Sequence, residues 1–131
     1  MSMSLYLTKF TKMDEQKYSE EKSKNLIIVE ISDDLYKEII EEFVCEQDFW
    51  ETGGEQSYPQ RIIPITDINK ILERCICRSK EIMKEVVEME NSKKEEDMKL
   101  DMINTILQIR HLLNKKREKY NDQDNIFIIA G

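Results

Sequence analysis

The sequence predicts a single α+β domain over residues 1–131, with about four short strands packed against three amphipathic helices. Short runs of β-branched and aromatic residues recur along the chain, and three longer segments carry apolar residues at helical spacing. The composition is 40% hydrophobic and 36% charged, which suits one modest core beneath a highly charged surface. The elements follow the order β-β-α-β-α-α-β, and we expect the last two helices to form a hairpin against the sheet.

Four segments have the composition of strands. The second is an almost continuous β-branched run, which favours a central strand covered on both faces. The third meets Pro64, which cannot donate a ladder hydrogen bond and therefore predicts a strand end or an edge. The last is apolar throughout, so we expect it inside the sheet. In order, the predicted strands are residues 4–10, Leu26–Ile31, Arg61–Ile65 and Ile126–Ala130.

Ser32 is a suitable N-cap for the first helix, whose apolar positions share one face as far as Phe49 or Trp50. Gly53–Gly54 should break it. The other helices are predicted over about 66–90 and 98–120, with a charged turn at 91–97 between them. Two segments have no strong periodicity, and we interpret them as a charged mobile loop at 11–25 and an aromatic and glycine-containing loop at 50–61.

Composition excludes several classes of function. The net charge of −7 argues against direct nucleic-acid binding through a basic face. One His and three Gly leave no His-rich metal site and no glycine-rich phosphate loop, so no cofactor is predicted. No segment approaches the ~20 apolar residues that span a bilayer, so no membrane contact is expected. Three Cys without an export signal are typical of reduced thiols in a cytoplasmic protein.

The cysteines and the single histidine are weak candidates for chemistry. Cys75 and Cys77 are two residues apart on a predicted helix, so they point in directions about 200° apart and do not match a zinc motif. We expect Cys75 to be buried, Cys77 to be exposed and His111 to face solvent. A Cys-dependent enzyme that uses Cys45 or Cys77 with His111 is the weakest functional hypothesis.

Three arginines are candidate anion-binding or ligand-binding residues. Arg110 lies near the apolar face of the last helix, where it would either form an internal ion pair with Glu30 or share an anion site with Arg117. The internal pair is the more common arrangement. Arg61 follows the aromatic segment and is the third candidate.

The segment from Phe49 to Arg61 holds the only Trp, a Gly-Gly pair and Tyr58. Trp, Tyr and Arg dominate the energetics of many interfaces. We expect Phe49 to be core, whereas for Trp50 and Tyr58 a core position and a recognition position are equally plausible from the sequence.

Acidic residues are concentrated in one third of the chain: the segment from Asp14 to Glu55 holds 14 of the 27 acidic residues and four of the 20 basic ones. Such a surface serves either solubility or a basic partner. We predict an acidic stripe along the first helix, formed by Asp34, Glu38, Glu41, Glu42, Glu46 and Asp48.

The opening Met1, Met3 and Tyr6 resembles that of small uncharacterised α+β proteins from bacteria and their phages. The ending is similar too, because a long helix there leads into an apolar strand closed by Gly131. The resemblance implies a bacterial or phage setting, in which small acidic proteins act by binding and blocking a larger machine. It transfers no site residues.

These observations favour a non-enzymatic acidic protein that inhibits a larger host machine by occlusion, as anti-defence proteins do. Its partner would carry a basic surface, such as a groove that handles nucleic acid, and Trp50 and Tyr58 would anchor the contact. The alternative is a protein that binds or sequesters a nucleotide signal, with Arg110 and Arg117 on phosphate and Trp50 or Tyr58 on the base. Leu100 and Leu112 fall outside the main apolar face, which leaves a homodimer open.

Overall fold

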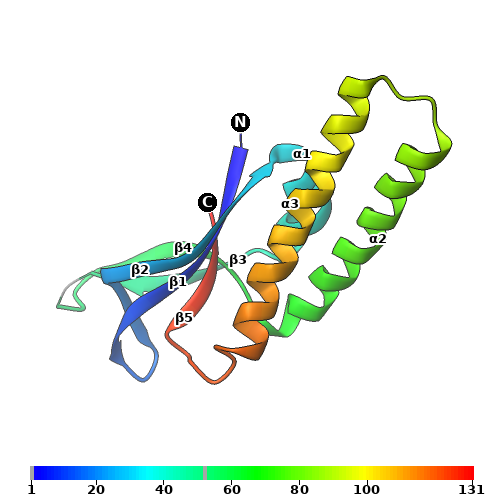
Figure 1. The fold of residues 1–131 in the computed structure, drawn as a ribbon. Coiled ribbons are helices and arrows are strands. Elements are labelled where there is room, and N and C mark those ends of the chain that lie inside the picture. The colour runs from blue at the N-terminus through cyan, green and yellow to red at the C-terminus, as the bar shows by residue number, and fades with distance from the viewer. Residues whose placement is uncertain (1, 52) are drawn as a thin grey trace.

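The computed structural model describes residues 2–51 and 53–131 as an α+β fold: a closed, mixed β-barrel with a long helical hairpin on one side (Figure 1). The strands of the barrel are β1 (Ser2–Asp14), β2 (Lys17–Ser32), β3 (Cys45–Trp50), β4 (Ser57–Ile63) and β5 (Ile126–Ala130). The first helical segment is α1 (Asp33–Leu35), which is continued by a π turn (Tyr36–Ile40) and a 3-10 turn (Glu41–Phe43). After β4, a second 3-10 turn (Ile65–Asp67) leads into the long helix α2 (Ile68–Glu88). The other long helix is α3 (Lys93–Glu118).

The barrel is built from two antiparallel hairpins joined by the last strand. The first hairpin pairs β1 with β2, and the second pairs β3 with β4. β5 lies between β1 and β4 and is antiparallel to both. The barrel closes where β2 meets β3 in parallel, and the register there pairs Ser19 with Trp50. The predicted strand Ile126–Ala130 is thus confirmed, together with its place inside the sheet.

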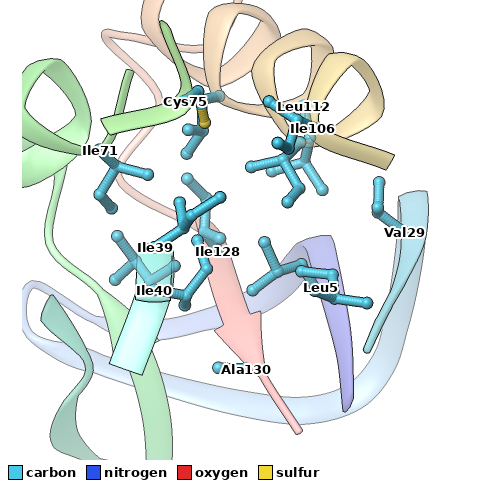
Figure 2. Packing of buried hydrophobic residues seen from close by; sticks show 14 of the residues in the cluster. Leu5, Val29, Ile39, Ile40, Ile71, Cys75, Ile106, Leu112, Ile128 and Ala130 are labelled. Carbon is cyan, nitrogen blue, oxygen red and sulfur yellow. The ribbon is translucent and has the colours of Figure 1, made fainter. Parts of the chain in front are cut away.

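The main core lies between the barrel wall and the helices. Alternation along β1 sends Leu5 and Leu7 toward this core, where both are fully buried. Figure 2 shows Leu5, Val29 and Ile128 from the strands facing Ile39, Ile71 and Ile106 from the helices. Burial of aliphatic side chains from these six separate segments stabilises this layer by about 1.5–3 kcal/mol for each fully buried residue.

A second, aromatic core fills the barrel interior. It comprises Phe10, Tyr18, Phe49, Ile62 and Ile129, with Phe127 packed against them. The ring centroids of Phe10 and Phe49 are 4.5 Å apart, and those of Tyr18 and Phe127 are 4.9 Å apart at 74°. The Tyr18–Phe127 pair is edge-to-face, a geometry that adds about 0.5–1.5 kcal/mol beyond the area buried.

The helical hairpin is antiparallel, as predicted, and two contacts set its register. Lys99 Nζ lies 3.7 Å from a Glu85 carboxylate oxygen, and Arg117 donates to the Asn69 side chain at 3.0 Å. α3 begins earlier than predicted, because Ser92 caps it by accepting a hydrogen bond from the Glu95 amide at 3.2 Å. Over the part of the chain that the structure describes, no helix is long and apolar enough to cross a membrane.

The prediction of a mobile loop at residues 11–25 is wrong. This segment forms the far half of the β1–β2 hairpin, and Asp14 pairs with Lys17 around a two-residue turn. Most of its side chains are exposed, so no alternating pattern marks it as a strand. Tyr18 and Ser19 are the buried exceptions, and they close the barrel. The pairing of neighbouring strands, rather than local periodicity, makes this segment extended.

The first helix is much shorter than predicted, which also corrects the strand count from four to five. Ser32 does cap it, accepting from the Leu35 amide, but helical structure ends at Phe43 and β3 follows. The predicted loop at 50–61 is reduced to the turn between β3 and β4, where Gly53 and Gly54 take φ values of 90° and 70°. Only glycine adopts such angles at little cost, so this pair makes the hairpin turn.

The predicted strand at Leu26–Ile31 lies within β2, but it is not covered on both faces. Val29 and Ile31 are buried against the helices, whereas Ile28 on the opposite face is 55% exposed. Pro64 directly follows β4. This confirms the prediction that proline, which has no backbone N–H to donate to a neighbouring strand, lies at a strand end. The helix prediction over about 66–90 agrees with α2 and its preceding 3-10 turn.

Candidate functional site: the barrel-mouth pocket

One end of the barrel opens into a pocket of about 800 Å³, which we call the barrel-mouth pocket. Four segments that are far apart in sequence line it: the β1–β2 turn, β3, the end of β4 with Pro64 and Ile65, and the turn between α3 and β5 that continues into β5. Its volume falls within the range of about 300–1,000 Å³ that is typical of ligand sites. The residues that matter below are Glu15, Tyr18, Asp48, Trp50, Lys116, Asp122, Asp124 and Phe127.

Three rings give the pocket an apolar wall. Tyr18 and Phe127 belong to the aromatic core and reach the pocket from inside the barrel. Trp50 stands at the end of β3 and is half-buried, so it is neither core nor fully exposed. The Lys17 ammonium lies 4.7 Å from the centroid of the Trp50 ring, a cation–π contact at the edge of the site. A flat or cationic group can therefore find a ring face here.

Carboxylates surround these rings. Glu15, Asp48 and Asp122 line the pocket and are exposed. Asp124 accepts a hydrogen bond from Lys12 at 2.6 Å, and that bond lowers the pKa of the Asp124 carboxyl. Asp124 also hydrogen-bonds Tyr18, whose own pKa is raised by burial. The rim therefore carries four carboxylates, and Lys12 compensates that of Asp124.

Lys116 is the one basic side chain among the residues that line the pocket, and it is only 7% exposed. Its ammonium donates to the backbone carbonyls of Tyr120 at 3.0 Å and Gln123 at 2.9 Å. Burial lowers the pKa of Lys116, while the nearby Asp122 and Asp124 act in the opposite direction. These bonds shape the turn between α3 and β5, so Lys116 supports the wall of the pocket rather than presenting a free cation to a ligand.

The acidic residues predicted as one stripe do not share one helix. Glu46 lies on β3, opposite Arg61, because helical structure ends before it. Two of the others pair with arginines of α2: Glu38 accepts from Arg78 at 2.8 Å, and Glu42 forms an ion pair with Arg74. Asp34 and Glu41 are exposed. Of the six predicted stripe residues, only Asp48 lines the barrel-mouth pocket, and it lies on β3 rather than on a helix.

The three candidate anion-binding arginines do not come together. Arg61 donates to the Tyr36 hydroxyl and lies over its ring. Arg117 bonds to Asn69, and Arg110 lines a small groove between α2 and α3. The ion pairs found over the described residues do not include the predicted pair of Arg110 with Glu30.

Of the two predicted aromatic anchors, Trp50 lines the pocket and Tyr58 does not. Tyr58 is half-buried against the aromatic core beside Glu20, and burial raises its pKa. Phe49 is fully buried, as predicted.

The cysteines and the histidine lie where the sequence predicted them: Cys75 is buried, and Cys77 and His111 are exposed. Burial raises the pKa of the Cys75 thiol to about 11, the opposite of what a nucleophile needs. Within the described chain, no group of three His, Cys, Asp or Glu side chains is placed to hold a metal ion.

Sequence reasoning missed most of the pocket, including Tyr18, Asp122, Asp124 and Phe127. Each lies in a segment with an ordinary local pattern, and only the closure of the barrel brings them together. One sequence feature could have indicated part of the pocket: the polar turn at residues 121–125 stands directly before an apolar strand that contains an aromatic residue. No protein-family model, curated protein or solved structure matches this chain.

Proposed function

We propose that this protein is a non-enzymatic binding protein that acts by occlusion, and that its barrel-mouth pocket receives a basic segment of a larger protein partner. The observation that carries the proposal is the combination of ring faces and carboxylates in one pocket: Trp50, Tyr18 and Phe127 lie beside Asp48, Asp122 and Glu15. The only lysine in the lining is already bonded to two carbonyls.

The chemistry of this lining favours an arginine or lysine side chain. The aliphatic stem of such a residue packs against the rings, its charge lies near a ring face, and its donors meet the carboxylates. A pocket of about 800 Å³ accommodates a few residues of a partner and keeps them from their normal contacts. The net charge of −7 would increase the rate of encounter with a basic surface.

The acidic residues of the first helical segment have a secondary role in this proposal. Asp34 and Glu41, and Glu46 on the following strand β3, are exposed and add to the long-range negative field. Glu38 and Glu42 are compensated by Arg78 and Arg74, so they are less available to a partner.

The proposal is tested by selecting ligands from a displayed library of random heptapeptides. We expect the wild-type protein to enrich peptides that carry Arg or Lys beside an apolar residue. A variant with Asp48→Lys and Asp122→Lys should bind the selected peptides at least tenfold more weakly, as measured by isothermal titration calorimetry. Trp50→Ala should also lower the affinity for these peptides. The matched control is Glu88→Lys with Glu90→Lys, which makes the same charge change at exposed sites outside the pocket lining and should bind as the wild type does.

Two results would contradict the proposal. One is enrichment of acidic or neutral peptides. The other is equal loss of binding in the pocket variant and in the control, because that result would mean that net charge alone attracts the peptides.

A small organic cation is the second candidate occupant, because the pocket volume also suits a small molecule. The nucleotide alternative has less support, since Arg61, Arg110 and Arg117 are absent from the lining. A thermal-shift comparison of spermidine with ATP separates the two. Stabilisation by spermidine that is lost in the Asp48→Lys, Asp122→Lys variant supports a cation, whereas stabilisation by ATP alone would favour an anionic ligand.

A further inference from the structure

β3 has one edge that no other strand covers along its length. On one side, β3 pairs with β4 over its whole length, from Cys45 to Trp50. On the other side, the only strand pairing within the described residues is the parallel contact of Trp50 with Ser19 of β2. The first part of β3 is therefore an open sheet edge, although the barrel closes at Trp50.

The hydrogen bonds of the β3–β4 hairpin show which backbone groups lie on that edge. The Glu51 amide donates to the Gln56 carbonyl at 2.9 Å, so these two residues form a pair of the hydrogen-bonded kind. Such pairs alternate along an antiparallel ladder, and the odd-numbered residues of β3 therefore bond to β4. Glu46 and Asp48 belong to the other set, so their backbone N–H and C=O groups point away from β4.

Pro59 on β4 supports this assignment independently. It lies opposite Asp48, in a pair that exchanges no hydrogen bonds, so its missing donor leaves no gap in the β3–β4 ladder. Its nitrogen faces the far side of β4 and blunts that edge against further pairing. β3 contains no proline, so the open edge keeps the two N–H donors and two C=O acceptors of Glu46 and Asp48.

The barrel-mouth pocket runs along this edge. Cys45 and Gln47 line it from one face of β3, and Asp48 and Trp50 line it from the other. Because successive residues of a strand point to opposite faces, a pocket that touches both sets extends past the edge between them. Beside the first part of β3 there is thus a pocket in the place where a neighbouring strand would lie.

Acidic side chains predominate along the edge and in the pocket beside it. β3, β4 and the pocket lining together contain five acidic residues and two basic ones, which are Glu15, Glu46, Asp48, Asp122 and Asp124 with Arg61 and Lys116. Lys116 donates to two backbone carbonyls. Arg61 donates to the Tyr36 hydroxyl, although it also lies opposite Glu46 across the hairpin.

Two lysines from the β1–β2 hairpin approach these residues. Lys12 pairs with Asp124, and Lys17 lies over the ring of Trp50. None of the ion pairs of the described residues includes Glu15, Asp48 or Asp122. A segment that approaches the open part of the edge therefore meets carboxylates without an ion pair, and this charge favours a basic segment over an acidic one.

We propose that the partner binds as an extended basic segment that adds one strand to β3 beside Glu46 and Asp48. This inference rests on the proposed function and specifies how the partner is held: backbone hydrogen bonds supply affinity, and alternate side chains supply specificity. Side chains on the face of Glu46 and Asp48 are basic. Those on the other face are apolar, because Phe49 of the aromatic core lies on that face. The recognised segment thus has basic and apolar residues in alternation.

N-methylated peptides test the added strand. The probe is the tightest basic heptapeptide from the library selection, and two derivatives carry N-methyl groups on alternate residues, one derivative for each alternate set. An added strand donates only from every second amide. One derivative should therefore bind at least about tenfold more weakly in isothermal titration calorimetry, and the other should bind within about threefold of the parent peptide. The two derivatives have the same charge, so each is the control for the other.

Backbone amides of the protein provide a second measurement. Saturation with the parent peptide should slow hydrogen exchange at the amides of Glu46 and Asp48 at least about tenfold, as measured by NMR. The amides of Gln47 and Phe49 already bond to β4, so their exchange should change less.

A proline substitution removes one donor from the edge. Glu46→Pro is compatible with the β3–β4 ladder, since the Glu46 amide does not donate to β4, and it should weaken peptide binding. Glu46→Ala is the matched control, because it removes the carboxylate and keeps the amide, and it should weaken binding less. Far-UV circular dichroism verifies that both variants keep the fold.

The outcomes separate this inference from the proposed function. If the library enriches no basic peptides, the proposed function is overturned and the added strand with it. If basic peptides bind but the two methylated derivatives lose affinity equally or not at all, only the added strand is overturned. Unchanged exchange at Glu46 and Asp48 in the saturated protein would also overturn it, because the peptide would then lie elsewhere.

Discussion

Arg78 on α2 donates a hydrogen bond from its Nε to the Glu38 carboxylate at 2.8 Å, and so joins the helical hairpin to the short helical segment that follows β2. The Arg78 side chain is only 23% exposed, and it also contacts Glu81 at 3.2 Å. This pairing explains why part of the acidic surface needs no external partner: its charge is compensated by arginines of the same chain.

We expect the Arg78–Glu38 contact to contribute measurably to stability. In a double-mutant cycle with Arg78→Ala and Glu38→Ala, the coupling energy from urea unfolding should be about 0.5–1 kcal/mol, because the arginine is largely shielded from water. The Arg74–Glu42 pair is the control, since both of its side chains are more exposed and its coupling should be smaller. Equal coupling energies in the two cycles would mean that the burial of Arg78 does not strengthen its ion pair with Glu38.

Phe49→Ala should destabilise the barrel severely. Phe49 is fully buried, and its ring lies 4.5 Å from that of Phe10 and 5.2 Å from that of Phe127. Removing a buried phenyl ring of this kind costs about 3–5 kcal/mol, which shifts the midpoint of urea unfolding markedly. Met98→Ala is the exposed control and should change stability by less than about 0.5 kcal/mol. Similar losses in the two variants would contradict an aromatic core inside the barrel.

Stability should fall between pH 9 and pH 11 because of Cys75. Burial raises its thiol pKa from 9.0 to about 11, so the unfolded chain loses this proton at lower pH than the folded chain does. The contribution is therefore fully present below pH 9 and is lost as the pH rises toward 11, a change of roughly 2–3 kcal/mol.

The measurement compares the free energy of unfolding of the wild type and of Cys75→Ala across this range. Tyr18, Tyr36 and Tyr58 also have raised pKa values and act in the same direction, but they are present in both proteins. The free energy of unfolding should fall more steeply with pH for the wild type than for Cys75→Ala. If the two proteins show the same dependence on pH, the pKa of the Cys75 thiol is not raised in the folded protein.

Thiol labelling should distinguish the three cysteines. Cys45 and Cys77 are exposed and Cys75 is buried, so Ellman's reagent should modify two thiols rapidly and the third only on unfolding. Cys45→Ser with Cys77→Ser should then abolish the rapid phase. Rapid reaction of the remaining thiol would indicate that α2 separates readily from the barrel.

Some parts of the fold were predictable because their signals are local. The apolar face of α2, the cap at Ser32 and the β-branched run Ile126–Ala130 each follow from residues within one or two turns or one strand. The burial of Cys75 and the exposure of His111 followed from the same helical wheels.

Other parts depended on pairing between distant segments. Residues 45–50 continue an apolar pattern that fits a helix, yet they form β3 because β4 supplies partners for their backbone groups. Residues 11–25 have few apolar residues and are extended because each strand of the β1–β2 hairpin pairs with the other.

The sequence by itself determined the two long helices, the strand at each end of the chain, the acidic balance and the absence of a glycine-rich phosphate loop, because composition and short-range periodicity are enough for these. Only the tertiary structure decided that the strands close into a barrel, that Trp50, Asp122 and Phe127 line one pocket at its mouth, and that Glu38 is paired with Arg78. The physical reason is that strand closure and side-chain pairing depend on contacts across many residues of sequence, and such contacts leave no local pattern.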